Sequence, residues 1–332
     1  MFSSRSFLFF LTVFSICSYA APHAEEAQDS SDLLSSINDR SDLQNIRAVI
    51  FDMDGVLRIG YDAIDGANDL INWMDDRGIP AVVLTNECRY TSDELRRDLK
   101  HMEISFPDSW GIYTSAMAMR DFFQDHLKIT KPVYVYVVGE NGIRKASMQV
   151  EREGVTFTRD LPDEKLEDLS LYVVFGSVDR IQITDLENAT RWIRAGAKVI
   201  TTCPDVSDPS SKGSTLVGMP NHLVHMIKMY APCVPYSIGK PHPFMIKEAL
   251  RLLTEKDKTL EQNEILFVGD TIDTDIRIAF EACIPSALVL SGNTKADAIE
   301  SNAVQASYVF PSVKELLEVF VESKSSTVSK NL

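Results

Sequence analysis

Carboxylates stand at two points where an apolar run of the chain stops. Asp52 and Asp54 lie two residues apart directly after the run 47–51, and Asp270 and Asp275 follow another such run far downstream. Open α/β sheets place their ligands just beyond the carboxyl ends of their strands, and carboxylate oxygens are the ligands that hard cations prefer. Acidic turns after strands are also common in ordinary folds. The meaning of these carboxylates therefore depends on what else the chain places beside them.

Two further stretches offer groups that bind phosphate oxygens. Thr85 and Asn86 follow the apolar run 81–84 and supply a hydroxyl and an amide, although both residue types also cap helices. Lys240 supplies a cation just ahead of an expected helix. In isolation a lysine is more often a solvated surface charge. Each of these stretches is weak evidence by itself.

The elements that must position these residues follow from the hydrophobic pattern. From residue 46, apolar β-rich runs alternate with helical periods, which is typical of a parallel sheet with helices on both faces. The strands we expect are 47–51, 81–84, 133–138, 171–175, 198–201, 264–268 and 287–290. Helices are expected near Pro243, from a capping box of Thr184 and Glu187 to Gly196, and after Asp275 with Ile276, Ala279, Phe280 and Cys283 on one apolar face.

Taken together and in this order, the four polar stretches resemble the four sequence motifs of the haloacid dehalogenase (HAD) superfamily. The resemblance covers residues 46–322 and is strongest to the NagD-like branch of p-nitrophenyl, pyridoxal phosphate and phosphoglycolate phosphatases. Supporting phrases are Ile64-Asp65-Gly66-Ala67, Tyr113-Thr114-Ser115-Ala116, Val138-Gly139-Glu140-Asn141-Gly142 and Leu288-Val289-Leu290-Ser291-Gly292. The resemblance implies an α/β fold, with a Rossmann-like, doubly wound parallel-sheet core and an inserted α/β cap domain.

The resemblance also implies a role for each polar residue. Asp52 would be the nucleophile that forms an aspartyl-phosphate. Asp54 would protonate the leaving oxygen and then activate the attacking water. The implied cofactor is Mg²⁺, bound by Asp52, the backbone carbonyl of Asp54, and Asp270, with Asp275 supporting through water or a hydrogen bond. Thr85, Asn86 and Lys240 would bind the phosphate oxygens.

The expected function is hydrolysis of small phosphorylated metabolites. The alternatives are a phosphotransferase of the same type and a non-catalytic binding protein with the HAD fold. A dehalogenase fits less well because those relatives lack the second aspartate that Asp54 supplies. Glu87 departs from the asparagine of many relatives, so it either points away from phosphate or favours substrates with a cationic group. The identity of the substrate and the question whether the chain forms a homodimer stay open.

An insertion is expected between the second and third motifs. The 154 residues between Thr85 and Lys240 far exceed what a crossover needs. The resemblance places the cap at residues 130–216 and the core at residues 46–129 and 217–323, and closure of such a cap shields the site from water. The loop 203–213 on that cap is expected either to read the leaving group or to be a plain connector.

The ends of the chain differ in composition from the rest. Arg5, the apolar run 7–16 and small residues up to Ala20 predict a signal peptide over residues 1–20 and export of the mature chain. The run is too short to span a bilayer as a helix, so no membrane span is expected after cleavage. Residues 21–45 and 324–332 are expected to be flexible.

Charge and cysteine content narrow the partners further. Net charge −15, from 33 basic and 48 acidic residues, disfavours nucleic acid and anionic membranes as partners. The mature chain keeps four widely spaced cysteines with no CxxC pair, which favours buried thiols over a metal site and leaves pairing open. Asn188 begins a glycosylation sequon whose use also stays open.

Overall fold

A computed structural model of the protein describes residues 40–205, 207–209, 216–217, 219–299 and 302–328. The predicted signal peptide lies outside the described residues. Six parallel strands form the core sheet in the order β15-β14-β13-β1-β4-β5. Their bounds are β1 Ala48–Phe51, β4 Ala81–Thr85, β5 Gly111–Thr114, β13 Ile265–Gly269, β14 Ser286–Val289 and β15 Tyr308–Phe310.

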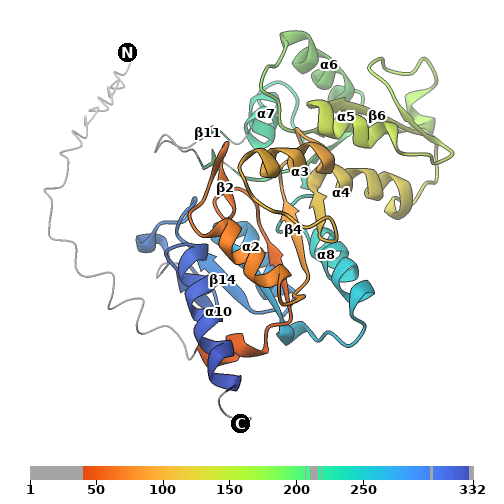
Figure 1. Cartoon of the computed structure of the whole chain (residues 1–332). Helices are drawn as coiled ribbons and strands as arrows, with labels where there is room; N and C mark the ends of the chain where they lie inside the picture. The colour runs from red at the N-terminus through yellow and green to blue at the C-terminus, as the bar shows by residue number, and fades with distance from the viewer. Residues whose placement is uncertain (1–39, 206, 210–215, 218, 300–301, 329–332) are drawn as a thin grey trace, which may run out of the picture. The chain divides into compact units, whose positions relative to one another are not determined.

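The core strands are apolar on both faces because both faces are covered. Val49 and Phe51 of β1 pack under one set of helices, and Ala48 and Ile50 pack under another, as the alternation of side chains along a strand requires. The first set contains α2 (Ala67–Asp75), α3 (Ser92–His101) and α10 (Val313–Val328), and the second contains α4 (Ser115–Asp121), α8 (Pro243–Lys256) and α9 (Arg277–Glu281). Figure 1 shows α2 and α10 side by side on the core sheet.

A second parallel sheet lies between the core motifs in sequence. Its order is β12-β9-β8-β6-β7, with bounds β6 Val133–Val138, β7 Val155–Phe157, β8 Ser170–Phe175, β9 Lys198–Thr201 and β12 Pro235–Ser237. The helices of this part are α5 (Asn141–Met148), α6 (Ile183–Arg194) and α7 (Met219–Lys228). We call these elements the second-sheet unit. Its β12 pairs with β9, so the unit extends past the predicted end of the insertion at residue 216.

Short elements complete the chain. Two antiparallel pairs are formed by β2 (Arg58–Ile59) with β3 (Asp62–Ala63) and by β10 (Ser207–Asp208) with β11 (Leu216–Val217). Short 3₁₀-helices are η1 Arg40–Asn45, η3 Leu166–Asp168, η4 Gln262–Glu264 and η6 Ala296–Ala298, and π-helical turns are η2 Phe122–His126 and η5 Ile272–Ile276. Strand β10 falls in the loop predicted at 203–213, part of which lies outside the described residues, and β11 follows that loop.

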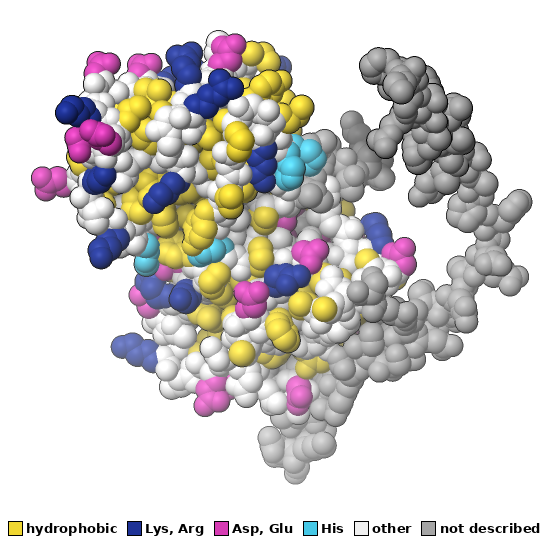
Figure 2. Space-filling model, turned by 180° about the vertical axis from the view of Figure 1, so that it is seen from behind, with side chains coloured by type: hydrophobic (Ala, Val, Ile, Leu, Met, Phe, Trp, Pro, Cys, Tyr) yellow, Lys and Arg dark blue, Asp and Glu magenta, His cyan; other side chains and the backbone are white. Residues whose placement is uncertain are grey.

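The segment from α7 to β12 exposes apolar side chains. Five large apolar side chains of this segment are between 48% and 90% exposed, namely those of Met226, Met229, Tyr230, Val234 and Tyr236. Figure 2 shows hydrophobic side chains gathered over the second-sheet unit on the face opposite to that of Figure 1. The homodimer stays a prediction, and this surface is where substitutions that test it should begin.

The seven predicted strands are all present, each within one or two residues of its expected ends. Two helix details were wrong. Helix α6 begins at Ile183 after Gln182, because the Thr184 hydroxyl donates to the Gln182 side chain instead of capping Glu187. The face predicted after Asp275 is buried only at Ile276 and Ala279, since Phe280 is 62% exposed and Cys283 is exposed as well.

The ends of the core are more ordered than the composition suggested. Leu43 of η1 is fully buried against the core, so the predicted lead-in becomes structured before residue 46. Helix α10 continues to Val328, five residues into the predicted tail. Among the described cysteines, Cys88 and Cys203 are buried, Cys283 is exposed, and none is paired. No helix in the described part of the chain has the length and apolar content that crossing a membrane requires.

Candidate active site

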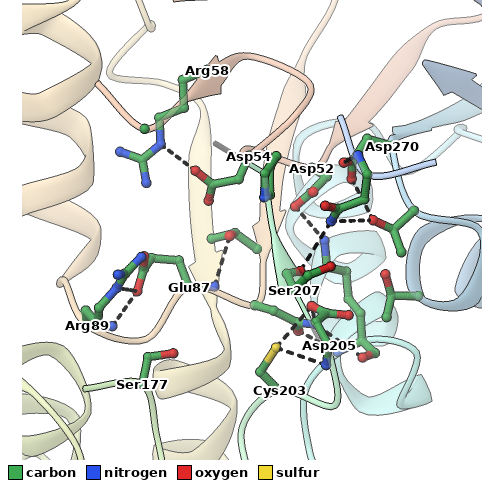
Figure 3. A pocket seen from close by; sticks show the side chains of 18 of the residues that line it. Asp52, Asp54, Arg58, Glu87, Arg89, Ser177, Cys203, Asp205, Ser207 and Asp270 are labelled. Carbon is green, nitrogen blue, oxygen red and sulfur yellow. Dashed lines mark hydrogen bonds and ion pairs between the residues drawn. The ribbon is translucent and has the colours of Figure 1, made fainter. Parts of the chain in front are cut away.

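Three neighbouring strands of the core sheet end in polar residues that the sequence singled out. Strands β13, β1 and β4 are adjacent and parallel, so their carboxyl ends meet at one edge of the sheet. Asp270 follows β13, Asp52 follows β1, and Thr85 closes β4. Figure 3 shows Asp52, Asp54 and Asp270 beside one pocket. The tertiary structure thus brings the predicted residues together.

Lys240 joins two carboxylates at the floor of this pocket. Its Nζ donates to Asp52 Oδ1 at 2.5 Å and lies 2.8 Å from Asp275 Oδ1, and all three side chains are at least nine-tenths buried. Burial alone lowers the pKa of Lys240, but the carboxylates of Asp275 and Asp52 outweigh it and raise the pKa above its ordinary value. The ammonium group is therefore a fixed positive charge within the site.

Asp270 and Asp275 are held by the backbone of their own loop and its neighbour. Asp275 Oδ2 accepts hydrogen bonds from the backbone N–H groups of Asp270 and Thr271, both at 3.1 Å. Asp270 Oδ1 accepts from the Thr271 hydroxyl at 2.9 Å, and its Oδ2 accepts from the backbone N–H of Asn293 at 2.6 Å. Both carboxylates are consequently preorganised by donors rather than left to rotate.

The acidic cluster fits a divalent cation. Asp52, Asp270 and Asp275 each place one carboxylate oxygen within 4.8 Å of the others. Burial raises the pKa of Asp52 well above its usual range, despite the opposing charge of Lys240. Burial, and then the charge of Asp275, raise the pKa of Asp270 to about 8. One ammonium does not balance three carboxylates, so these oxygens suit a hard, oxygen-binding ion such as Mg²⁺.

Asp54 lies at the mouth of the pocket and is paired with an arginine. Its Oδ1 accepts from Arg58 Nε at 3.0 Å. Burial opposes the charge of Arg58, but the carboxylates of Asp54 and Glu87 raise its pKa above the ordinary value, so the guanidinium stays charged. Unlike Asp52, Asp54 is only partly buried. Asp54, the residue predicted to act as acid and base, is therefore more accessible to a bound ligand than Asp52 is.

Two glycines allow the surrounding loops to approach Asp270. Gly55 has a φ of +84°, and a Cβ built there would lie 2.3 Å from Asp270 Oδ2. A Cβ at Gly292 would lie only 1.9 Å from the same oxygen. The two loops are joined by the Ser291 hydroxyl, which donates to the Gly55 carbonyl at 2.6 Å. Any larger residue at either position must displace the Asp270 carboxylate.

The last residue of β4, Thr85, and the next residue, Asn86, have different surroundings. Thr85 is buried, and its Oγ1 accepts the Glu87 N–H at 3.0 Å. The Asn86 side chain is occupied by protein: Oδ1 accepts the Lys240 N–H at 2.8 Å, and Nδ2 donates to Asp205 Oδ2 at 2.9 Å and to the Lys240 carbonyl at 3.3 Å. Asn86 therefore holds the Lys240 backbone, whereas contact of Thr85 with phosphate stays a prediction.

Glu87, the departure from the family pattern, faces Arg89. Its side chain is 3% exposed, and its two oxygens accept from the Arg89 guanidinium at distances from 2.6 to 3.1 Å. Arg89 Nη1 also donates to Asp179 of the second-sheet unit at 3.3 Å. The Glu87 carboxylate is neutralised within the protein, so the suggestion that it favours a cationic substrate has no basis in this geometry.

The pocket is a cavity of about 280 Å³ that extends from the acidic cluster to the second-sheet unit. Its wall includes three polar side chains that sequence reasoning missed, those of Arg58, Arg89 and Asn293. Asn293 directly follows the phrase that ends at Gly292, so a signal for it was present. Nothing in the local pattern distinguished the two arginines from surface charges.

Two family patterns match the chain. Residues 49–152 match the family described as haloacid dehalogenase-like hydrolase, and residues 237–316 match the family described as HAD-hydrolase-like. The first range contains Asp52, Asp54 and Thr85, and the second contains Lys240 and Asp270. The matches thus fall on the two parts of the chain that supply the core residues of the pocket.

Known proteins are similar over most of the chain. The acid sugar phosphatase of Staphylococcus saprophyticus is 28% identical over 83% of this chain and 98% of its own length. NagD from Escherichia coli K-12 is 31% identical, with a TM-score of 0.66 over 81% of this chain and 98% of its own. A glycerol phosphate phosphatase from Mycobacterium tuberculosis, solved in complex with calcium, is 26% identical, with a TM-score of 0.66 over 83% of this chain and 76% of its own.

Proposed function

This chain belongs to the haloacid dehalogenase superfamily as a phosphoric monoester hydrolase of the NagD-like type, and on that premise we propose how it works. It hydrolyses small phosphorylated metabolites with Mg²⁺ and forms an aspartyl-phosphate on Asp52. The observation that carries the proposal is the buried contact of Lys240 with Asp52 beside Asp270 and Asp275.

In the first half-reaction the Asp52 carboxylate attacks phosphorus, and the bond from phosphorus to the leaving oxygen breaks. Negative charge on the phosphoryl oxygens is stabilised by the Lys240 ammonium and the Thr85 hydroxyl, which lie at the same edge of the sheet. The burial of Lys240 strengthens this effect, because charges interact more strongly away from water. In the second half-reaction water attacks phosphorus and releases Asp52 and inorganic phosphate.

The cation site is formed by residues already in place. Asp52, Asp270 and the Asp54 backbone carbonyl would hold Mg²⁺, while Asp275, whose oxygens face Lys240 and two N–H groups, supports them. When bound, the ion offsets the repulsion between Asp52 and a phosphate dianion. A divalent cation in the related glycerol phosphate phosphatase supports this assignment.

Asp54 is the proposed general acid and base. It lies on the same loop as Asp52, two residues on, and its partly exposed carboxylate lines the cavity. It donates a proton to the leaving oxygen in the first half-reaction and takes one from water in the second. A single group serves both steps because the leaving oxygen departs from the side of phosphorus opposite to Asp52, and water later attacks from that same side.

The second-sheet unit is proposed to act as the cap. Asp205 and Asp179 of this unit contact Asn86 and Arg89 of the core, so the cavity is bounded by both parts. Such a cover keeps bulk water from the phosphoryl group and places the organic part of the substrate against the second-sheet unit. Asp205 belongs to the 203–213 loop, so its hydrogen bond with Asn86 anchors that loop to the core.

The substrate class follows from the relatives and the cavity. Relatives named acid sugar phosphatase and glycerol phosphate phosphatase indicate phosphate esters of small hydroxylated compounds, which suit a cavity of about 280 Å³ with a polar wall. Transfer to an organic acceptor in place of water is the remaining alternative. The enzyme class of the relatives argues against a purely binding role.

One experiment tests the proposal. Release of inorganic phosphate is measured from 4-nitrophenyl phosphate and from a panel of sugar and polyol phosphates, with Mg²⁺ or with EDTA, and with or without added alcohols. We expect turnover that EDTA abolishes and Mg²⁺ restores, with phosphate and alcohol released in equal amounts. Turnover that persists in EDTA contradicts the cation site, and phosphate recovered mainly on added alcohols identifies a phosphotransferase.

A further inference from the structure

Arg58 is a charged residue deep in the site that the reaction described above does not use. Its side chain is 4% exposed, against 30% for its ion-pair partner Asp54. In the described part of the chain, the bond from Nε to Asp54 Oδ1 is the only hydrogen bond that this guanidinium makes. Burying a guanidinium for one bond is costly, so its position calls for an explanation.

The backbone fixes both ends of this pair. The Arg58 N–H donates to the Met53 carbonyl at 3.2 Å, and the Arg58 carbonyl accepts the Gly55 N–H at 2.7 Å. Asp54 and Arg58 are further joined by an isolated β-bridge, and Arg58 opens β2, which pairs with β3. The loop that carries Asp54 therefore closes on the residue that binds its carboxylate.

The other charges of the pocket direct Arg58 to Asp54. Glu87 is the nearest alternative partner by charge, but Arg89 occupies both of its oxygens. Figure 3 shows these as two separate pairs, with Arg58 pointing to Asp54 and Arg89 folded over Glu87. Arg89 is thus a second arginine of the same cavity that does not bind Asp54.

The Arg58 contact engages one oxygen of Asp54 only. Oδ1 accepts from Nε, while Oδ2 has no hydrogen-bond partner among the residues described. A general acid must bring one oxygen within hydrogen-bond reach of the leaving atom, and a misplacement of about 1 Å costs about 10²-fold in rate. A single bond to Oδ1 restrains the carboxyl group and leaves Oδ2 for the substrate.

We propose that Arg58 is the positioning residue of the acid–base group: it fixes Oδ1 of Asp54 so that Oδ2 meets the leaving oxygen. The inference rests on the proposed role of Asp54 in protonating that oxygen. It predicts that the contribution of Arg58 depends on how much the leaving group needs a proton. A residue that only stabilises the fold has no such dependence.

The test compares two substrates of similar size, 4-nitrophenyl phosphate and phenyl phosphate. The 4-nitrophenolate ion leaves readily without a proton, whereas phenolate is a poorer leaving group that depends on one. The readout is kcat/KM, because it covers only the steps up to departure of the leaving group. The variants are Arg58→Met, Arg58→Lys, Asp54→Asn and, as a matched control, Arg89→Met, all assayed as full chains with Mg²⁺.

We expect Arg58→Met to lower kcat/KM by about 10²-fold for phenyl phosphate and by about tenfold at most for 4-nitrophenyl phosphate. Arg58→Lys keeps the charge but loses the Nε geometry. Its selectivity, the ratio of kcat/KM for 4-nitrophenyl phosphate to that for phenyl phosphate, should therefore lie between those of the wild type and Arg58→Met. Arg89→Met should change kcat/KM for both substrates by the same factor. In the Asp54→Asn background, Arg58→Met should add no further selectivity.

Equal losses on the two substrates with Arg58→Met, or no loss, overturn the proposal. Circular dichroism and the melting temperature establish that each variant is folded, and if Arg58→Met is not, the substrate selectivity of Arg58→Lys decides in the same way. If Asp54→Asn itself shows no selectivity, the acid role of Asp54 fails. If Asp54→Asn is selective and the Arg58 variants are not, only the positioning role fails.

Discussion

Lys240 Nζ donates to Asp52 Oδ1 at 2.5 Å although 188 positions separate the two residues in the chain. The lysine backbone is fixed by Asn86, whose side chain bonds both the N–H and the carbonyl of Lys240. The ammonium group also faces Asp275, so its removal leaves two buried carboxylates without a counter-charge. All four sequence motifs thus meet in this one set of contacts.

Replacing Lys240 with Met should lower kcat by about 10²- to 10³-fold, because one donor to the developing phosphoryl charge is lost. It should also lower the free energy of unfolding, by about 3 kcal/mol or more for a broken buried pair. Lys240→Arg should not restore activity, since the buried site holds a compact ammonium. Steady-state kinetics and urea unfolding check both effects, and near-normal turnover of Lys240→Met contradicts the assignment.

Asp52→Asn and Asp54→Asn should fail at different steps. Asp52→Asn removes the nucleophile, so no covalent phosphoenzyme should form. Asp54→Asn should still bind phosphate and metal, while turnover falls by about 10²- to 10⁴-fold for want of a proton partner. Beryllium fluoride with Mg²⁺ should be retained by the wild type and by Asp54→Asn. Near-normal turnover of Asp52→Asn would rule out the mechanism.

The pH dependence of stability should differ between the metal-free and the metal-bound protein. Asp270 has a pKa of about 8 in the folded protein and 3.8 ordinarily, so between these values the metal-free folded state keeps a proton that the unfolded state has released. The stability of the metal-free protein should therefore fall as pH rises through this window. Mg²⁺ binds the ionised carboxylates, so its stabilisation should grow with pH.

Melting temperatures in EDTA and in Mg²⁺, measured at both ends of that window, check this expectation. The difference between the two conditions should be larger at the alkaline end. A difference that does not vary with pH means that the carboxylates are ionised throughout, and the raised pKa of Asp270 is then contradicted.

Gly292→Ala should weaken cation binding more than it weakens the fold. The new Cβ would meet Asp270 Oδ2 at 1.9 Å, so the carboxylate must rotate away from its bond with Asn293. We expect the Mg²⁺ concentration for half-maximal activity to rise by about tenfold or more, as for other changes around metal ligands. Gly111→Ala is the control, because its new Cβ would lie at an ordinary 3.4 Å from Leu252 Cδ1. It should leave this Mg²⁺ concentration unchanged.

The mature chain is expected to start at or near Ala21 and to be exported. The prediction rests on residues 1–20 alone, where a basic residue, an apolar run and small residues occur in the order that signal peptidases require. Intact-mass measurement on protein from its native host decides the matter. Recovery of the uncleaved chain from the cytosol would show that the segment is no signal peptide.

The sequence by itself determined the fold class and the residues that carry the charge of the site. Apolar runs long enough to be buried on both faces identified seven strands, because a strand covered by helices on both sides tolerates few polar residues. Asp52, Asp54 and Asp270 were recognisable because they follow such a run, and Lys240 because it precedes an expected helix, within a known order of motifs. Local pattern and motif order carry this information without any tertiary contact.

The strands β7, β12 and β15 were not predicted, since three residues give too little periodicity to read, and β5 was missed because it begins at Gly111, a residue type that is depleted in strands. Partner choice was also beyond the sequence. Only the folded chain pairs Asn86 with Lys240, Arg89 with Glu87 and Arg58 with Asp54. Such pairs form because side chains distant in sequence lose their water together at the sheet edge and must satisfy their charges with whatever lies there. The tertiary structure therefore decided which polar residues face the ligand and which hold the others in place.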